Sequence, residues 1–317
     1  MTARVPAGGE FAVIDRLKHR LPGPPAGEIW IGDDAAVLGP SGAQTLLTTD
    51  MSVAGVHADL ALVGLDDLGW RAVAAAVSDI AAMGGRATAV LVAVAGPPAT
   101  DLDTLYQGVA QSVAAHGCHV VGGDLSNASE VVVVVAVTGV VDDGPGPVRR
   151  DGAHSGDHLF VTGPVGAAAA GLRTLRAQAA AGHRTPASHD TPVIEAYRRP
   201  HARLVEGDAA RRAGASAMID ISDGFAADLG HLAKASAVGF RLDRVPVAPG
   251  ATVEEALGGG DDYELVFAAP DPGKVAEVFA AAGLTPPIAV GVCTGDRGQR
   301  EWAGTALPPS GWEHHWS

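Results

Sequence analysis

The chain has 317 residues, and 22 Lys and Arg against 36 Asp and Glu give it a formal net charge of −14. Apolar residues make up 47% of the sequence and charged residues 18%, a composition that excludes wholesale disorder. The acidic balance argues against a nucleic-acid-binding surface, which needs clustered Lys and Arg, so we expect no nucleic-acid partner.

The sequence also lacks the marks of a secreted or membrane protein. Its longest apolar runs, 89–95 and 131–137, are far too short to span a bilayer, and residues 1–17 contain no apolar core of a signal peptide. The two cysteines, Cys118 and Cys293, are too few for a disulfide framework or a four-cysteine zinc site. We therefore expect a cytoplasmic protein with reduced thiols and no membrane partner.

Two kinds of apolar segment alternate along the chain. Short runs rich in β-branched residues predict strands at 45–47, 88–94, 131–137, 158–161, 264–267 and 288–292. Longer alanine-rich runs predict helices at 66–83, 100–116 and 224–237, with Asp66 as the N-cap of the first and with Gly84 and Gly117 ending the first two. Because strands and helices are interleaved, the fold class is α/β or α+β.

A cluster of turn-forming residues, DDGPGP at 142–147, follows a strand that reads as buried on both faces. It predicts a domain boundary, with a first domain at residues 1–147 and a second at 148–317. The polar stretch at 177–192 contains alanine and proline and predicts a surface connection within the second domain.

The most informative feature is that apolar or glycine-rich segments run directly into aspartate six times. These segments lead to Asp33–Asp34, Asp50, Asp79, Asp124, Asp220–Asp223 and Asp261–Asp262. We interpret the aspartates as carboxylates at strand ends, which are costly unless something compensates their charge. Mg²⁺ is a natural compensation because it is a hard cation that prefers oxygen ligands, and adjacent glycines let backbone N–H groups approach phosphate oxygens.

Other interpretations of the aspartates exist. Each one alone could cap a helix or close a turn, and two carboxylates would be enough for acid–base hydrolysis. Six dispersed acids instead favour a phosphate site with several metal ions. The phosphate loop G-x-x-x-x-G-K-[ST], the motif G-x-G-x-x-G after a strand and the protein-kinase signatures are all absent. The sequence therefore predicts that any nucleotide is bound through aspartate and metal.

Eight short motifs follow one another in order along nearly the whole chain. They are G-D-D-A-A (32–36), T-T-D-M-S-V-A-G-V-H (48–57), S-D-I-A-A-M-G (78–84), G-G-D (122–124), R-D-G-A…G-D (150–157), I-D-I-S-D-G (219–224), G-D-D-Y-E-L (260–265) and G-W-E-H-H (311–315). As an ordered set they resemble the thiamine-monophosphate kinase family. That family belongs to a superfamily of ATP-using enzymes similar to aminoimidazole-ribonucleotide synthetase.

The resemblance implies a fold and a reaction. The first domain would be a mixed-sheet half-barrel with helices, through which two copies form a homodimer, and the second an α/β sandwich. The implied reaction is ATP + thiamine monophosphate → ADP + thiamine diphosphate, by direct in-line transfer with several Mg²⁺ ions. No catalytic base is expected, because the attacking phosphate oxygen is already an anion. The main barrier is the repulsion between two polyanions, which Mg²⁺ lowers.

Matching motif positions imply three groups of site residues. The implied metal ligands are Asp33, Thr48 or Thr49, Asp50, Asp79, Asp124, Asp220 and Asp223. The implied ATP contacts are Tyr106, Gly123, Asp124, Arg150 (with Arg149 as the competing arginine) and Ser222. The implied contacts to thiamine monophosphate are His57, Asp261 and Trp312, with Trp302 and Trp316 as alternatives to the last.

Three of these assignments leave alternatives open. Asp261 stands where the family usually has glutamate, which is one methylene longer, so a contact bridged by water is an alternative to a direct contact with substrate. His57 could be a structural histidine, and Tyr106 could simply pack within its helix.

Related functions fit the sequence less well. A hydrogenase-maturation dehydratase would end in a reactive cysteine, whereas this chain ends His-His-Trp-Ser. A selenophosphate synthetase would carry Cys or selenocysteine near its N-terminus, whereas no Cys precedes Cys118. A purine-pathway cyclase stays possible on the fold alone, and a non-catalytic cation- or nucleotide-binding module is the alternative from a different class.

Overall fold

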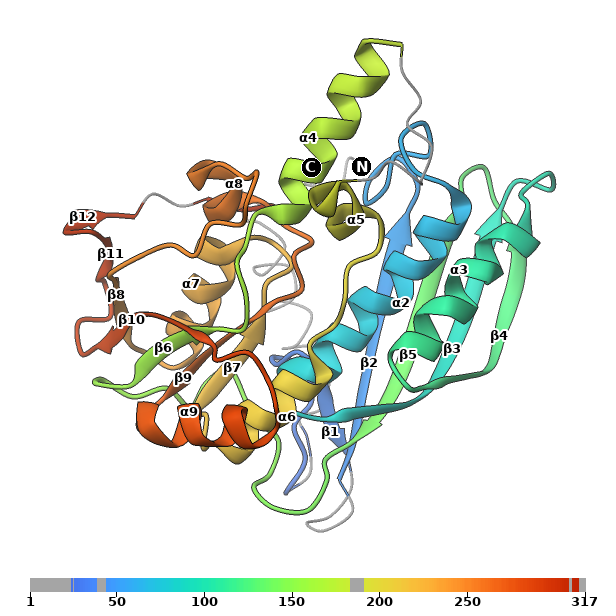
Figure 1. Cartoon of the computed structure of the whole chain (residues 1–317). Helices are drawn as coiled ribbons and strands as arrows, with labels where there is room; N and C mark the ends of the chain where they lie inside the picture. The colour runs from blue at the N-terminus through green and yellow to red at the C-terminus, as the bar shows by residue number, and fades with distance from the viewer. Residues whose placement is uncertain (1–23, 25, 39–43, 183–190, 308–309, 314–317) are drawn as a thin grey trace, which may run out of the picture.

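The computed structural model describes residues 24, 26–38, 44–182, 191–307 and 310–313. It contains two β-sheets that lie side by side, each covered by helices (Figure 1). The strands of the first sheet lie between residues 36 and 140, and those of the second between 158 and 306. The predicted mixture of strands and helices is therefore confirmed.

The first sheet is mixed and has the strand order β1-β2-β5-β3-β4. Its strands are β1 (Ala36–Leu38), β2 (Thr45–Val53), β3 (Arg86–Gly96), β4 (His119–Asn127) and β5 (Val132–Val140). Strands β3 and β4 are parallel, and the other neighbouring pairs are antiparallel. Helices α2 (Leu65–Ala82) and α3 (Leu102–Ala115) lie across one face of this sheet (Figure 1).

The two faces of the first sheet differ in what covers them. Because side chains alternate along a strand, the fully buried Val135 and Val137 of β5 mark the face under the helices. Leu47, Met51 and Leu91 belong to the opposite face and are 39%, 51% and 49% exposed. A single chain therefore leaves apolar surface uncovered on this open face.

The second sheet has seven strands in the order β12-β11-β8-β10-β6-β9-β7. They are β6 (His158–Val161), β7 (Ala217–Asp220), β8 (Gly239–Leu242), β9 (Leu265–Ala269), β10 (Ile288–Thr294), β11 (Arg300–Trp302) and β12 (Thr305–Ala306). The accompanying helices are α4 (Ala167–Ala180), α5 (Pro192–Arg198), α6 (Leu204–Arg212), α7 (Phe225–Ala235), α8 (Val253–Gly258) and α9 (Pro272–Ala281). Helices α7 and α8 pack on one face, while α6 and α9 pack on the other, which makes this half an α/β sandwich.

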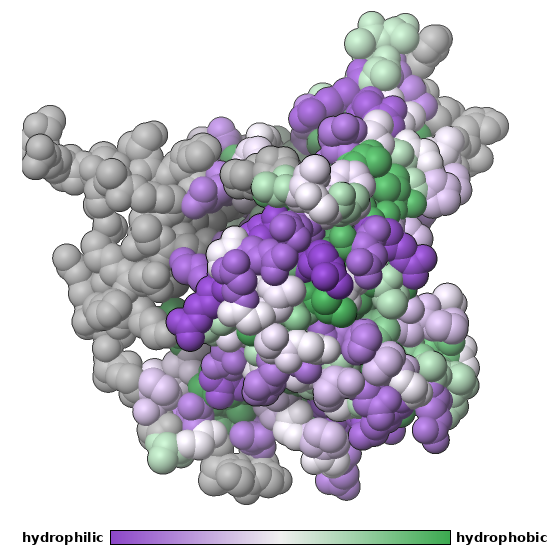
Figure 2. Space-filling view, turned by 90° about the vertical axis from the view of Figure 1, so that its left-hand side faces the viewer, coloured by the Kyte–Doolittle hydropathy of each residue, from purple (hydrophilic) through white to green (hydrophobic). Residues whose placement is uncertain are grey.

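The outer surface of this half is mostly polar. On the side of the molecule where the second sheet lies, hydrophilic residues cover most of the described surface and apolar ones are scattered between them (Figure 2). No helix among the described residues is both long and apolar enough to cross a membrane.

Helix α2 contributes to both halves of the molecule. Its Val73 and Val77 belong to the core of the first half, whereas Ala81 and Ala82 belong to the core around α6 and α9. A residue near its C-terminal end can therefore reach both sheets. The carboxylates described below converge at this end.

The structure corrects the placement of several aspartates. Strand β2 continues to Val53 and therefore contains Asp50, β4 contains Asp124, and Asp79 lies inside helix α2. The interpretation of these three as strand-end residues is wrong, and among the motif aspartates only Asp220 is the last residue of a strand. Polar residues are tolerated within β4 because all of its residues are exposed.

Two further expectations differ from the structure. Helix α2 begins after Gly64 rather than at Asp66, because the carboxylate of Asp67 accepts a hydrogen bond from the Gly64 N–H at 3.2 Å and so closes the first turn. Helix α4 continues to Ala180, so the predicted surface connection is wrong for residues 177–180; residues 183–190 lie outside the described part of the chain. Gly84 and Gly117 follow their helices with φ of +69°, as predicted.

Candidate functional site

Three carboxylates from distant segments meet where α2 approaches the second sheet. Asp34 precedes β1, Asp79 lies near the end of α2, and Asp220 ends β7; one oxygen of each lies within 4.8 Å of the other two. The side chain of Asp34 is 4% exposed, and its Oδ2 is buried with no hydrogen-bond partner among the described residues. Clustered buried carboxylates are costly by themselves, and an all-oxygen donor set fits a divalent cation.

Burial raises the pKa of all three groups, and repulsion by neighbouring carboxylates adds to the shift of Asp79 and of Asp220. Burial, followed by the charge of Asp34, raises the pKa of Asp220 to about 7. Burial, followed by the charges of Asp220 and Asp34, raises the pKa of Asp79 well above its usual range. Burial also raises the pKa of Asp34, although Arg150 opposes the shift. A cation bound among these groups would favour their ionised forms and remove this cost.

Two hydroxyl groups orient the carboxylates. The Thr48 hydroxyl donates to Asp79 Oδ2 at 2.5 Å, and the Ser78 hydroxyl donates to Asp220 Oδ2 at 2.6 Å. Thr48 and Asp50 share the face of β2 that points toward the helices, because their cross-strand partners on β5 are fully buried. The charge of Asp50 also contributes to the raised pKa of Asp79. Thr48 and Asp50 therefore lie on the same side as the three carboxylates.

Asp33, the predicted ligand, faces two arginines rather than this group. Arg150 places Nη2 2.7 Å from Asp34 Oδ1 and Nε 3.6 Å from Asp33 Oδ1. Burial, followed by the charge of Asp34, raises the pKa of Asp33 to about 7. Arg149 is 45% exposed and approaches Asp33 only to 4.0 Å, so the geometry favours Arg150 as the arginine beside the carboxylates. Asp34 was not among the predicted metal ligands, although the doubled aspartate at 33–34 was a signal for it.

Asp124 and Gly123 do not join the carboxylates within one chain. Their strand, β4, is the edge strand at the opposite end of the sheet from β1 and β2. Asp124 is opposite Ala93, whose neighbours Val92 and Val94 are buried under the helices. Asp124 therefore belongs to the open face of the sheet. Thr49 is exposed and belongs to the same open face.

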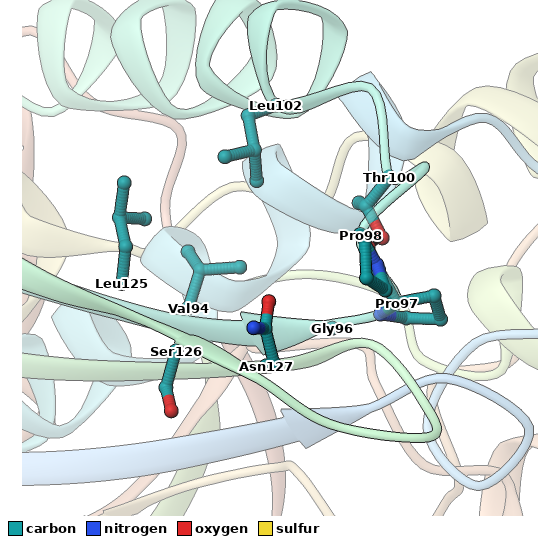
Figure 3. A pocket seen from close by; sticks show the side chains of 9 residues that line it. All are labelled: Val94, Gly96, Pro97, Pro98, Thr100, Leu102, Leu125, Ser126 and Asn127. Carbon is teal, nitrogen blue, oxygen red and sulfur yellow. Dashed lines mark hydrogen bonds between the residues drawn. The ribbon is translucent and has the colours of Figure 1, made fainter.

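A cavity of about 190 Å³ lies beside β4, between the ends of β3 and β4 and the start of α3 (Figure 3). Val94 and Leu125 project into it from the sheet, below Leu102 of α3 (Figure 3). Tyr106 lies one turn after Leu102, and its hydroxyl donates to the Val92 carbonyl at 3.3 Å. The predicted nucleotide contacts Tyr106 and Gly123 are thus neighbours of this cavity, not of the carboxylates.

Two of the predicted substrate contacts, His57 and Asp261, lie on loops, and the Asp261 loop is tied to the segment that follows Asp220. His57 Nδ1 accepts a hydrogen bond from the Val53 N–H at 3.0 Å, so the neutral ring carries its proton on Nε2. The Asp261 N–H donates to the carbonyl of Ser222 at 2.8 Å, which ties the G-D-D-Y-E-L loop to the I-D-I-S-D-G motif.

The C-terminal tryptophan returns to the same region. Trp312 is 57% exposed, and its backbone N–H donates to the Asp223 carbonyl at 2.9 Å. Of the two alternatives, Trp302 lies in β11 and Trp316 lies outside the described residues. Trp312 is thus the tryptophan that the described chain brings to the I-D-I-S-D-G motif.

Asp223 also belongs to a second group of possible cation ligands, with Asp228 and His231 of α7. Asp228 is 2% exposed and accepts hydrogen bonds from the N–H groups of Asp223 and Gly224, both at 3.0 Å. Burial, followed by the charge of Arg150, lowers the pKa of His231 to about 4, so its ring is neutral at physiological pH. Asp228 and His231 were not predicted as site residues, although their i,i+3 spacing in a predicted helix was a signal for them.

Comparison with known proteins decides the family. The model of the AIR synthase related protein N-terminal domain matches residues 32–141, and that of the C-terminal domain matches residues 154–303. The thiamine-monophosphate kinase of Mycobacterium tuberculosis (strain H37Rv) is 36% identical over 285 residues, which cover 83% of this chain and 82% of the relative. The chain belongs to the thiamine-monophosphate kinase family.

Other members of the thiamine-monophosphate kinase family are similar to this chain over most of its length. The Salmonella typhimurium enzyme is 34% identical over 296 residues, which cover 89% of each chain. A solved structure described as "AaThiL complexed with AMPPCP and TMP" matches with a TM-score of 0.84 and 30% identity, over 99% of this chain and 100% of that one. The family and the two-domain fold predicted from the ordered motifs are confirmed.

Proposed function

We propose that this protein transfers the γ-phosphoryl group of ATP to thiamine monophosphate and releases ADP and thiamine diphosphate. The observation that carries the proposal is the convergence of Asp34, Asp79 and Asp220 in a chain whose relatives are named thiamine-monophosphate kinase. In the reaction, the bond between the γ-phosphorus and the β,γ-bridging oxygen breaks. A new bond forms between that phosphorus and an oxygen of the monophosphate.

The donor set supports several Mg²⁺ ions as cofactors. Asp34, Asp79 and Asp220 would hold one, with Thr48 and Asp50 beside them. When bound, Mg²⁺ neutralises phosphate charge. This neutralisation matters because two like unit charges about 4 Å apart repel by about 4 kcal/mol at an effective dielectric constant near 20.

The chain's own residues bind and orient the two substrates. The guanidinium of Arg150 lies beside the carboxylates and suits a nucleotide phosphate, since it can donate two parallel hydrogen bonds. His57 presents an Nε2–H donor for the monophosphate. Trp312, which is 57% exposed, would stack on the positively charged thiazolium ring. No residue needs to remove a proton, because the attacking oxygen is already ionised.

We further propose that the protein is a homodimer in which each copy completes the nucleotide site of the other. Among the described residues, β1 pairs with residues 45–47 of β2 and, through Val37, with Ile29, so the edge of β2 beyond Leu47 has no neighbouring strand there. Strand β4, at the opposite edge, is exposed along its whole length. Unpaired edges and the apolar open face both support closure of two sheets around a twofold axis. That closure would place β4 of one copy beside β2 of the other, and with it Gly123 and Asp124 near Thr49 and Asp50.

The activity is tested by incubating the full chain with ATP, Mg²⁺ and thiamine monophosphate and measuring thiamine diphosphate by chromatography. We expect product that depends on Mg²⁺, and we expect Asp50→Asn to abolish turnover while circular dichroism shows an intact fold. Glu277→Gln, on the exposed side of α9, is the matched control and should stay active. Bound ATP without any product would favour the non-catalytic nucleotide-binding module.

The shared site is tested by mixing two inactive variants, Asp79→Asn and Asp124→Asn, under conditions that exchange subunits. In a mixed dimer, one site combines an intact Asp79 from one copy with an intact Asp124 from the other. Random exchange should therefore restore about a quarter of wild-type activity, since half of the dimers are mixed and each has one intact site. No recovery, or sedimentation as a strict monomer, would contradict the shared site but not the reaction.

A further inference from the structure

A buried arginine links the loops that carry two of the predicted substrate contacts. Arg71 of α2 has a side chain that is 5% exposed. Its Nη2 donates to Asp261 Oδ2 at 2.9 Å and to the His57 carbonyl at 3.2 Å. Its Nη1 donates to the Tyr197 carbonyl, and the guanidinium lies over the Tyr197 ring, 4.4 Å from the centroid. One side chain therefore binds three segments that are far apart in sequence.

The carboxylate of Asp261 is engaged on both oxygens. Oδ2 accepts from Arg71, and Oδ1 accepts from the Tyr263 hydroxyl at 3.1 Å. The loop that carries this carboxylate is strained, because Asp261 and Tyr263 have φ of +68° and +51°, values that cost energy for residues other than glycine. Such a backbone persists only where its surroundings hold it, and Arg71 is one of the groups that do so here.

The same arginine also restrains His57. The carbonyl of His57 accepts from Arg71, while its ring Nδ1 accepts from the Val53 N–H. Main chain and ring are thus both held, which sets the direction of the Nε2–H. Lysine could replace only part of these contacts, because its single ammonium group keeps the charge but lacks the planar fork that reaches several acceptors and stacks on a ring.

We propose that Arg71 is a positioning residue for thiamine monophosphate: it holds the His57 loop against the Asp261 loop, and Asp261 acts on the substrate through Arg71 rather than by touching it. This inference rests on the proposed function. It revises the expectation that Asp261 is itself a substrate contact. It also explains how a shorter aspartate serves at this position, since the arginine reaches toward it from α2.

The experiment measures kcat and KM for each substrate in wild type, Arg71→Lys, Arg71→Met, Asp261→Asn and the double variant Arg71→Met/Asp261→Asn. Arg71→Met should raise KM for thiamine monophosphate by about tenfold or more, as expected for the loss of charge-assisted hydrogen bonds, and should leave KM for ATP nearly unchanged. Arg71→Lys should rescue part of the loss. Arg241→Met, which removes an exposed arginine from β8, is the control and should behave as wild type.

The double variant tests whether Asp261 acts through Arg71. If it does, the double variant should be no worse than Arg71→Met alone, because both changes break the same contact. Additive losses would show that Asp261 contacts substrate by itself and would overturn the proposal. Should Arg71→Met fail to fold, Arg71→Lys and Asp261→Asn carry the same comparison of the two KM values.

The outcomes separate this inference from the proposed function. An active wild type whose Arg71 variants change both KM values equally, or only the unfolding midpoint, overturns the positioning role and leaves the reaction standing. A wild type that neither phosphorylates thiamine monophosphate nor binds it in titration calorimetry overturns both.

Discussion

Replacing Asp220 with asparagine measures how much the ionised carboxylate of Asp220 opposes folding, because the substitution removes the charge and keeps the shape of the side chain. Asp220 is 4% exposed, and burial together with the charge of Asp34 raises its pKa from 3.8 to about 7. A carboxyl group with such a difference between unfolded and folded states opposes folding by roughly 4 kcal/mol once it is ionised in both. Asparagine has nearly the same volume and can still accept the hydrogen bond from Ser78.

The sign of the pH dependence follows from the direction of this shift. Because the folded pKa lies above the unfolded value, the protonated Asp220 favours the fold fully below pH 3.8, and this stability is lost as the pH rises to about 7. The free energy of unfolding of the metal-free wild type should therefore fall between about pH 4 and about pH 7 more steeply than that of Asp220→Asn. At about pH 8 without metal, the variant should be the more stable protein, by up to about 4 kcal/mol.

Mg²⁺ should reverse this order. A cation that binds only the folded state stabilises it in proportion to the logarithm of its concentration over Kd, and the variant has lost one carboxylate ligand. The assay is urea unfolding followed by circular dichroism, with EDTA or with Mg²⁺ and with Glu277→Gln as the control. The reasoning would be refuted if Asp220→Asn were less stable than wild type at about pH 8 in EDTA, or if Mg²⁺ raised the free energy of unfolding of the variant as much as that of wild type.

Three other substitutions test the fold around the site, each by urea unfolding. In Gly108→Ala the new Cβ would lie 1.7 Å from the Asp66 carbonyl, so α2 and α3 must separate and we expect a loss of at least about 2 kcal/mol. Arg203→Met removes the cation 2.5 Å from Glu264, which is 4% exposed, and should cost about 1 to 3 kcal/mol, because the buried carboxylate keeps the hydrogen bond from Thr162 but loses its counter-charge. Burial lowers the pKa of His116 from 6.5 to about 4. The neutral ring therefore stabilises the fold fully above pH 6.5, and this stability is lost as the pH falls toward 4. His116→Gln should reduce this acid-induced fall in the free energy of unfolding.

Each of these three has an outcome that contradicts it. An unchanged midpoint in Gly108→Ala would mean that the two helices can part without cost. If Arg203→Met were as stable as wild type, the Glu264 charge would have to be compensated by another group. If His116→Gln kept the full loss of stability in acid, that loss would have to come from other titrating groups.

Much of the secondary structure and the family could be predicted from local sequence. Strands at 158–161 and 288–292 were visible as short β-branched runs, and Gly84 and Gly117 marked helix ends, because these features depend on neighbouring residues and backbone geometry alone. The ordered aspartate motifs likewise identified the family, since motif order is a property of the chain. The length of β2 and the presence of β4 were not visible in the sequence. The polar residues of β4 are tolerated because the whole strand is exposed at the edge of the sheet, whereas Thr48 of β2 is tolerated because its hydroxyl donates to Asp79.

The membership of the site depended on the tertiary structure. Asp34 rather than Asp33 joins Asp79 and Asp220, because the turn before β1 decides which of two adjacent side chains points inward. Asp124 belongs to the other face of the sheet, which is a consequence of strand order and register. The contact of Arg71 with Asp261 joins residues 190 positions apart. No local sequence pattern predicts such long-range contacts, because they form only when separate strands and helices pack around a common core.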